Sequence, residues 1–210
     1  MTATRLIHIV DDDESMRTAL QRLLTEGGFQ TRVYGSTGEF LLEPLPDQPA
    51  CLLLDVRLPG PSGLDLQAAL QRQNVALPVI FLTGHADVAS SVRAMKTGAV
   101  DFLEKPVEPD ILFAAIRSAL AHEESRRAAR EAADQLRKRL DLLTLQQREV
   151  FNRIVIGKLN KETAHELGIS ERTVKTRRAE VMAKLGADSV AELGRQAEQL
   201  RLLSEGDGPP

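Results

Sequence analysis

The sequence predicts an α/β domain built on a five-stranded, doubly wound parallel sheet, followed by a long linker helix and an all-α domain of four helices. Three observations on the 210-residue chain predict this fold class. Short apolar runs alternate five times with amphipathic stretches over residues 1–120. A stretch of mixed charge without Gly or Pro follows, and after it come four short helical patterns separated by capping residues and glycines.

The predicted strands are four or five residues long and mostly apolar on both faces, as parallel strands covered by helices on each side are. They are Leu6–Val10, Thr31–Tyr34, Cys51–Leu54, Val79–Leu82 and Val100–Leu103. The helices that alternate with them are Glu14–Glu26, Ser36–Leu42, Gly63–Gln73, Ala86–Thr97 and Glu108–Leu120. This alternation predicts one domain over residues 1–120.

Residues 121–142 are predicted to be a helical linker, because Ala, Arg, Glu and Leu dominate them and no helix breaker interrupts them. Two interpretations of this helix remain open. It is either a single exposed spacer or a pairing helix, whose short coiled-coil seam would use Ala129, Ala133, Leu136, Leu140 and Leu143.

The second domain is predicted over residues 143–203, with a disordered tail at 204–210. Thr144 and Gln147 have the spacing of a capping box, and Asn160 and Ser170 are predicted to cap the next two helices. The last helix has an apolar stripe that either packs on its own domain or pairs two chains. The stripe comprises Val190, Leu193, Ala197 and Leu200.

Composition predicts a cytoplasmic protein whose two halves carry opposite charge. Residues 1–120 hold 10 Lys and Arg against 15 Asp and Glu, whereas residues 144–203 hold 11 against 8. Neither a membrane-spanning apolar run nor a secretory signal is recognisable in the sequence. The single cysteine, Cys51, lies in an apolar run and is interpreted as a core residue. The acidic and basic halves are expected to bind different partners.

Polar side chains follow four of the predicted strands at their carboxyl ends. Asp11 and Asp12 follow the first strand, Asp55 the third, Thr83 the fourth and Lys105 the fifth. Ligands of parallel sheets gather at this edge, so the five side chains are expected in one crevice. Carboxylates with waters and a carbonyl suit Mg²⁺, and a carboxylate beside Mg²⁺ can attack a phosphoryl donor to give an acyl phosphate.

The segments "HIVDDDESMR", "LLLDVRLPGPSGLDL", "VIFLTGHADV" and "GAVDFLEKP" resemble a response-regulator receiver domain over residues 5–122. The resemblance implies a flavodoxin-like fold with Asp55 as phosphoacceptor. It implies Mg²⁺ held by Asp11, Asp12, Asp55 and the backbone carbonyl of Arg57. A receiver catalyses only its own phosphorylation and dephosphorylation, so we expect no enzyme.

Three further roles are implied by the same resemblance. Thr83 would bond the phosphoryl group, Lys105 would form an ion pair with it, and the peptide between Lys105 and Pro106 would be cis. Phe102 occupies an aromatic switch position and, lacking a hydroxyl, would act with Thr83 through packing; the alternative is an ordinary core aromatic.

The segment "GKLNKETAHELGISERTVKTRRAEVMAKLGA" has the layout of a helix-turn-helix, with Gly168 at the turn. A helical projection of the third helix puts Val174, Val181 and Leu185 on the core face and cationic or small residues opposite. This region resembles the LuxR/FixJ-type four-helix DNA-binding domain from Leu143 to Leu200. The candidate DNA-binding residues are Lys161, Arg172, Thr173, Lys175, Thr176, Arg177 and Arg178.

Together these features predict a two-component response regulator. A cognate sensor histidine kinase would phosphorylate Asp55, and the chain would bind promoter DNA as a homodimer promoted by phosphorylation, without a membrane partner. Activation would either relieve inhibition of the helical domain or build a dimer face. The alternatives are a Mg²⁺-dependent aspartyl phosphohydrolase with Asp11 as nucleophile, and a DNA-binding protein that works independently of phosphorylation.

Overall fold

The computed structural model describes residues 5–45, 48–84 and 88–206, with side chains through residue 198. Contacts divide the chain into two compact units, Met1–Arg126 and Arg127–Pro210. No helix within these described segments is long and apolar enough to cross a membrane.

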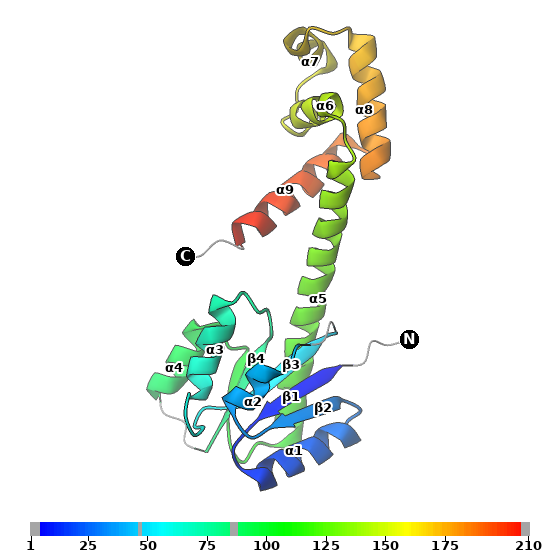
Figure 1. Cartoon of the computed structure of the whole chain (residues 1–210). Coiled ribbons are helices and arrows are strands. Elements are labelled where there is room, and N and C mark those ends of the chain that lie inside the picture. The colour runs from blue at the N-terminus through cyan, green and yellow to red at the C-terminus, as the bar shows by residue number, and fades with distance from the viewer. Residues whose placement is uncertain (1–4, 46–47, 85–87, 207–210) are drawn as a thin grey trace. The chain divides into compact units, whose positions relative to one another are not determined.

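The first unit contains the predicted five-stranded parallel sheet (Figure 1). Its strands are β1 (Leu6–Val10), β2 (Gln30–Tyr34), β3 (Ala50–Asp55), β4 (Val79–Thr83) and β5 (Asp101–Glu104). They lie in the order β2-β1-β3-β4-β5, and every neighbouring pair is parallel. Its helices are α1 (Glu14–Glu26), α2 (Thr37–Leu42), α3 (Gly63–Arg72), α4 (Val88–Lys96) and the first part of α5 (Pro109–Asp141). The predicted fold class is confirmed.

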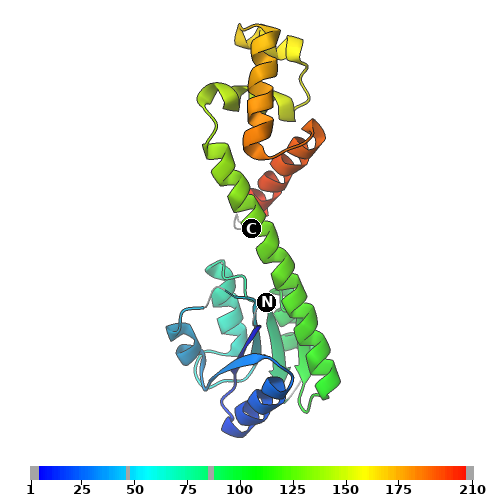
Figure 2. The ribbon, with the colours of Figure 1, turned by 90° about the vertical axis from the view of Figure 1, so that its right-hand side faces the viewer.

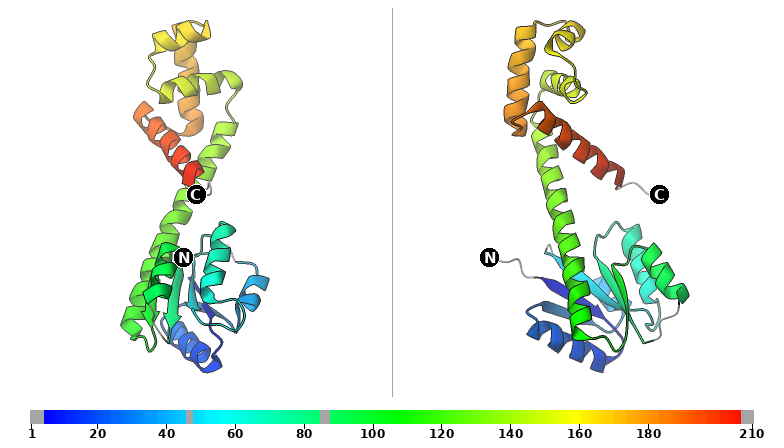
Figure 3. Two further views of the ribbon diagram at one scale, coloured as in Figure 1. Left: turned by 90° about the vertical axis from the view of Figure 1, so that its left-hand side faces the viewer. Right: turned by 180° about the vertical axis from the view of Figure 1, so that it is seen from behind.

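Helices cover both faces of the sheet, so β1, β3 and β4 are buried throughout (Figures 1 and 3). On one face, Leu24 of α1 and Ile116 of α5 pack with Ile9 and Ile80 of the sheet. On the other face, Phe40 of α2 and Leu66 of α3 join the core with Ala94 of α4. Burial on both faces explains why these strands are apolar without alternation.

Helix α5 continues without a break through the predicted linker and ends at Asp141. Beyond residue 126 its apolar side chains pack within the second unit. Ala133 and Leu143 are buried, and Leu136 and Leu140 contact the core around Val181. The three leucines of the stripe that suggested a coiled-coil seam, Leu136, Leu140 and Leu143, therefore pack on the chain's own helical core.

The second unit is all-helical, as predicted (Figure 2). Its further helices are α6 (Leu145–Val155), α7 (Asn160–Leu167), α8 (Glu171–Leu185) and α9 (Val190–Gly206). Helix α9 reaches Gly206, so the first three residues of the predicted tail are helical, and residues 207–210 lie outside the described range. Leu193 of α9 is buried in the unit's core and Val190 packs against it, which supports packing for this part of the α9 stripe.

Two of the three predicted caps at α6, α7 and α8 are present. Thr144 and Gln147 form a reciprocal capping box, and the Ser170 hydroxyl accepts from the Thr173 amide. The predicted cap at Asn160 is wrong, because Asn160 is the first residue of α7 and Leu159 precedes it as the N-cap. The Asn160 side chain oxygen instead accepts a hydrogen bond from Arg178 of α8, at 3.0 Å.

Candidate functional site

Strand register brings Asp11 and Asp55 side by side at one edge of the sheet. Val10 of β1 pairs with Leu54 of β3, so the residue that follows each of them reaches the same level. Both residues are buried: Asp11 is 2% exposed and Asp55 is 9% exposed. Two anions held close together out of water repel each other unless a cation compensates them.

Lys105 supplies this cation from the end of β5. Its Nζ donates to Asp11 Oδ2 and to Asp55 Oδ2, both at 2.6 Å. Burial alone would lower the pKa of Lys105, but the hydrogen bonds to Asp11 and Asp55 outweigh it and raise that pKa above the ordinary 10.5. The peptide between Lys105 and Pro106 is cis, as the resemblance implied.

Asp12 adds a third carboxylate to this cluster. Oxygen atoms of Asp11, Asp12 and Asp55 lie within 4.8 Å of one another, and Asp12 is exposed to solvent. Carboxylate oxygens at such spacing are the hard ligands that Mg²⁺ prefers, and an exposed member leaves room for the waters that Mg²⁺ retains. The donor set therefore fits a divalent cation.

The backbone around Asp55 is held by its neighbours in the loop that follows β3. The Arg57 amide donates to Asp55 Oδ1 at 3.0 Å, which orients the carboxylate. Gly63, the first residue of α3, packs so closely that a Cβ there would lie 2.1 Å from the Asp55 carbonyl oxygen. Only glycine fits this position without a shift of the backbone. The first residue of α3 therefore packs directly against the backbone of Asp55.

Thr83 and Phe102 lie on β4 and β5 near this edge. Thr83 is buried at the end of β4, one residue beyond Leu82, which pairs with Asp55. Its carbonyl accepts from the Lys105 amide at 2.7 Å. Phe102 is half-buried and packs against Phe81, with ring centroids 6.0 Å apart. It therefore packs on the face of the sheet that α3 and α4 cover.

The second unit presents a cationic surface on α8. Val174, Val181 and Leu185 are buried, as the helical projection predicted, and α8 packs against both α6 and α7. The opposite face exposes Arg172, Lys175, Thr176, Ala179 and Ala183, and α7 exposes Lys161. Gly168 adopts a left-handed conformation at φ 64°, which makes the tight turn between α7 and α8.

Four of the candidate DNA-binding residues have hydrogen-bond partners within the unit. The Thr176 hydroxyl donates to the Arg172 carbonyl at 3.1 Å. Thr173 is half-buried, and its hydroxyl is 2.8 Å from that of Ser170. Arg177 donates to Gln146 and Arg178 to Asn160, at 3.2 Å and 3.0 Å. The two arginine contacts hold α8 against α6 and α7, and the Thr173 contact lies within the cap of α8 itself. Arg172, Lys175 and Lys161 are exposed to solvent.

Comparison with known proteins identifies both units. Residues 7–117 match the response regulator receiver domain, and residues 141–197 match the luxR family of bacterial regulatory proteins. The chain belongs to the response regulators. It is a transcription factor with a receiver and a LuxR-type DNA-binding domain, and not a phosphohydrolase.

Several relatives of this response regulator match nearly its whole length. Nodulation protein W of Bradyrhizobium diazoefficiens is 43% identical over 93% of this chain and 86% of its own length. The transcriptional regulatory protein FixJ of Rhizobium meliloti is 40% identical over 97% of each chain. Among solved structures, the response regulator StyR superposes with a TM-score of 0.82 at 41% identity, covering 94% of this chain and 100% of that one.

The structure also reveals a contact of this regulator that the sequence interpretation missed. Arg17 of α1 donates from Nη1 to the carbonyl oxygen of Asp11, at 2.7 Å. A usable signal was present, because Arg17 follows the helix cap Asp13 by four residues and helical side chains lean toward the N-terminus.

Replacing Lys105 by methionine tests the shared ion pair. Without the ammonium, Asp11 and Asp55 face each other uncompensated, so the free energy of unfolding at pH 7 should fall by about 3 kcal/mol. Because the pKa of Lys105 is raised in the folded state, this difference persists below pH 10.5 and is lost as the pH rises through the folded pKa. Urea denaturation in EDTA measures both effects.

The matched control is Lys96→Met, which removes an exposed lysine of α4. Its unfolding free energy should stay within about 0.5 kcal/mol of wild type. Equal stability of wild type and Lys105→Met at pH 7 would contradict the ion pair.

Proposed function

We propose that this response regulator is switched by phosphorylation of Asp55 and then binds promoter DNA as a homodimer. Residues 1–120 would act as the receiver, 121–142 as the linker and 143–203 as the DNA-binding domain. The observation that carries the proposal is the cluster in which Lys105 bridges Asp11 and Asp55. We place the protein in the cytoplasm with its cognate sensor histidine kinase, since the family's receivers imply such a partner.

Phosphoryl transfer assigns a distinct task to each residue. An Asp55 carboxylate oxygen attacks the phosphorus of the kinase phosphohistidine. The new P–O bond forms as the P–N bond breaks, and the released imidazole nitrogen takes a proton. Lys105 exchanges one carboxylate contact for a phosphoryl oxygen, and the Thr83 hydroxyl donates to another. The product is an acyl phosphate on Asp55.

Asp11, Asp12, Asp55 and the Arg57 carbonyl would hold Mg²⁺ in this site. The bound ion would neutralise charge on the phosphoryl oxygens during transfer. Asp11 is buried and fixed by hydrogen bonds from Lys105 and the Asp13 amide, so its carboxylate is presented in a set direction. The added phosphoryl group would alter the contacts of Thr83. In response, the Phe102 side chain would change its packing against Phe81.

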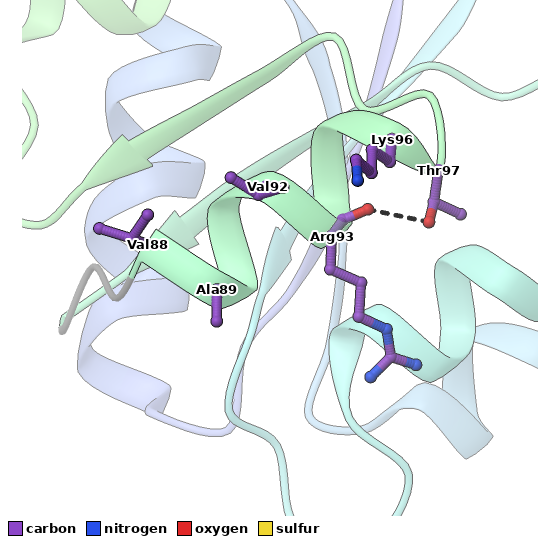
Figure 4. Close-up of a pocket in the computed structure, with 6 residues that line it drawn as sticks. All are labelled: Val88, Ala89, Val92, Arg93, Lys96 and Thr97. Atoms are coloured by element: carbon purple, nitrogen blue, oxygen red, sulfur yellow. Dashed lines mark hydrogen bonds between the residues drawn. The ribbon is translucent and has the colours of Figure 1, made fainter.

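A surface on α4 supports dimerisation of the receiver. Val88, Val92 and Met95 are exposed at 79%, 46% and 49%, and Arg93 and Lys96 lie beside them. Figure 4 shows a hollow lined by residues of this helix. An exposed apolar face with a charged rim is typical of a protein interface. We propose that this face pairs two receivers after phosphorylation.

DNA binding would use the exposed face of α8 in the major groove. We propose that Arg172, Lys175 and Thr176 reach bases or phosphates there, while Lys161 of α7 contacts the backbone. Thr173, Arg177 and Arg178 would orient α8 through their contacts with Ser170, Gln146 and Asn160, and the two arginines would offer their remaining donors to phosphate.

Asp55→Asn tests the phosphoacceptor. The amide cannot act as the attacking carboxylate, so incorporation of label from radioactive acetyl phosphate should fall to background, and phosphorylation should no longer raise DNA affinity. Glu104→Gln, an exposed acid on β5, is the matched control and should be labelled like wild type. Full labelling of Asp55→Asn would refute the assignment, and labelling of wild type without any change in DNA affinity would favour phosphorylation-independent binding.

Lys175→Ala tests the DNA-binding face. Loss of one phosphate contact should weaken binding to a random-sequence duplex and reduce the slope of log affinity against log salt by about 1. Fluorescence anisotropy at several salt concentrations measures both. Arg195→Ala removes an exposed charge from α9 and should leave the slope unchanged. Identical affinities of wild type and Lys175→Ala at every salt concentration would exclude Lys175 from the interface.

Val92→Asp tests the α4 interface. A carboxylate in the apolar face should keep the protein monomeric in the presence of beryllium fluoride and Mg²⁺, conditions under which wild type is expected to dimerise. Sedimentation velocity distinguishes the two states. Leu42→Asp, at an exposed position of α2, should dimerise like wild type. A Val92→Asp dimer as stable as that of wild type would rule out this face.

A further inference from the structure

Arg17 of α1 makes a contact with the acidic loop that phosphoryl chemistry does not require. Its Nη1 donates to the Asp11 carbonyl oxygen at 2.7 Å, and the residue is half-buried. The same nitrogen lies beside Gly35, where a Cβ would be 3.7 Å away. The guanidinium is thus held between the loop after β1 and the loop after β2.

This contact fixes the peptide that joins Asp11 to Asp12. The Asp11 amide donates to the Tyr34 carbonyl at 3.2 Å, and its own carbonyl accepts from Arg17, so Asp11 is bound on both sides of its backbone. Because a peptide is planar, holding the Asp11 carbonyl also sets the direction of the Asp12 amide and the position of its Cα. Asp12 is exposed, so its direction depends on this backbone more than on packing.

The start of α1 places opposing charges near Arg17. Asp13 caps the helix by accepting from the Ser15 and Met16 amides, and Glu14 begins it. The N-terminal end of a helix carries partial positive charge and disfavours a cation nearby. Arg17 lies in the second turn, but its side chain leans back to the loop where Asp11 and Asp12 lie. The carboxylates at this end of α1 therefore favour the guanidinium, whereas the helix dipole opposes it.

We propose that Arg17 is a positioning residue for the metal site, holding the Asp11–Asp12 peptide so that both carboxylates face Asp55. This inference rests on the proposed binding of Mg²⁺. For the effect of removing Arg17 on Mg²⁺ affinity, positioning and simple charge repulsion predict opposite signs. A cation near the site repels Mg²⁺, so its removal would tighten binding if charge alone mattered. If Arg17 positions the Asp11–Asp12 peptide, its removal instead weakens the binding of Mg²⁺.

The test is titration of the full-length chain with MgCl₂ alone, followed by amide chemical shifts in NMR spectra that also report folding. Arg17→Ala should raise the dissociation constant for Mg²⁺ roughly tenfold, since hydrogen bonds to a charged donor are among the stronger ones. Arg17→Lys keeps the charge and one donor and should bind Mg²⁺ more tightly than Arg17→Ala. In labelling by acetyl phosphate, the Mg²⁺ concentration for half-maximal rate should rise, while the rate at saturating Mg²⁺ stays within about threefold of wild type.

Arg22→Ala is the matched control, because it removes the same charge from α1 at an ion pair with Glu26 that is exposed to solvent. Its affinity for Mg²⁺ should equal that of wild type. Arg17→Ala that binds Mg²⁺ as tightly as wild type, or more tightly, would overturn the positioning role alone. A wild-type protein with no Mg²⁺-dependent shifts would overturn the proposed metal site as well. If Arg17→Ala does not fold, Arg17→Met replaces it in the test, because methionine keeps an unbranched apolar stem and lacks every donor. Arg17→Met should bind Mg²⁺ more weakly than wild type, and equal binding would refute the role.

Discussion

One ammonium group shared by two buried carboxylates is the constraint on which the receiver site depends. Parallel pairing of β1 with β3 places Asp11 level with Asp55, and Lys105 reaches both from the end of β5 at 2.6 Å. A site with this balance of charge responds strongly to an added cation, which competes with Lys105 for the carboxylate oxygens, and to a phosphoryl group, which competes with the carboxylates for Lys105. The sheet thus places two carboxylates and one ammonium group at the same edge. A change in their hydrogen bonds alters contacts between residues at the carboxyl ends of β1, β3 and β5.

In the helical unit, one face of α8 is held by hydrogen bonds and packing while the other face exposes its cationic side chains. Gln147 of α6 is buried and connects to α8 twice, donating to Glu180 and accepting from Lys184, both at 2.8 Å. Lys184 also donates to the carbonyl of Leu142. These bonds and the apolar core fix the buried face of α8, so the opposite face can present charge without a large entropic cost on binding.

Much of this architecture is predictable from the sequence, because apolar runs and capping residues are local signals. The convergence of Asp11, Asp55 and Lys105 followed from the rule that parallel strands share a carboxyl end. Local patterns did not reveal partners distant in the chain, such as Arg178 for Asn160. For the same reason, the apolar stripe of α5 could not be assigned between its own helical core and another chain, since periodicity gives the face of a helix and not what covers it.

Crystals of the protein soaked in Mn²⁺ would show whether the acidic cluster holds a divalent cation beside Asp55. Anomalous scattering locates this ion without reference to activity. We expect one strong peak within coordination distance of Asp11, Asp55 and the backbone carbonyl of Arg57. An empty cluster at saturating Mn²⁺, with Lys105 still bridging the two carboxylates, would contradict this expectation.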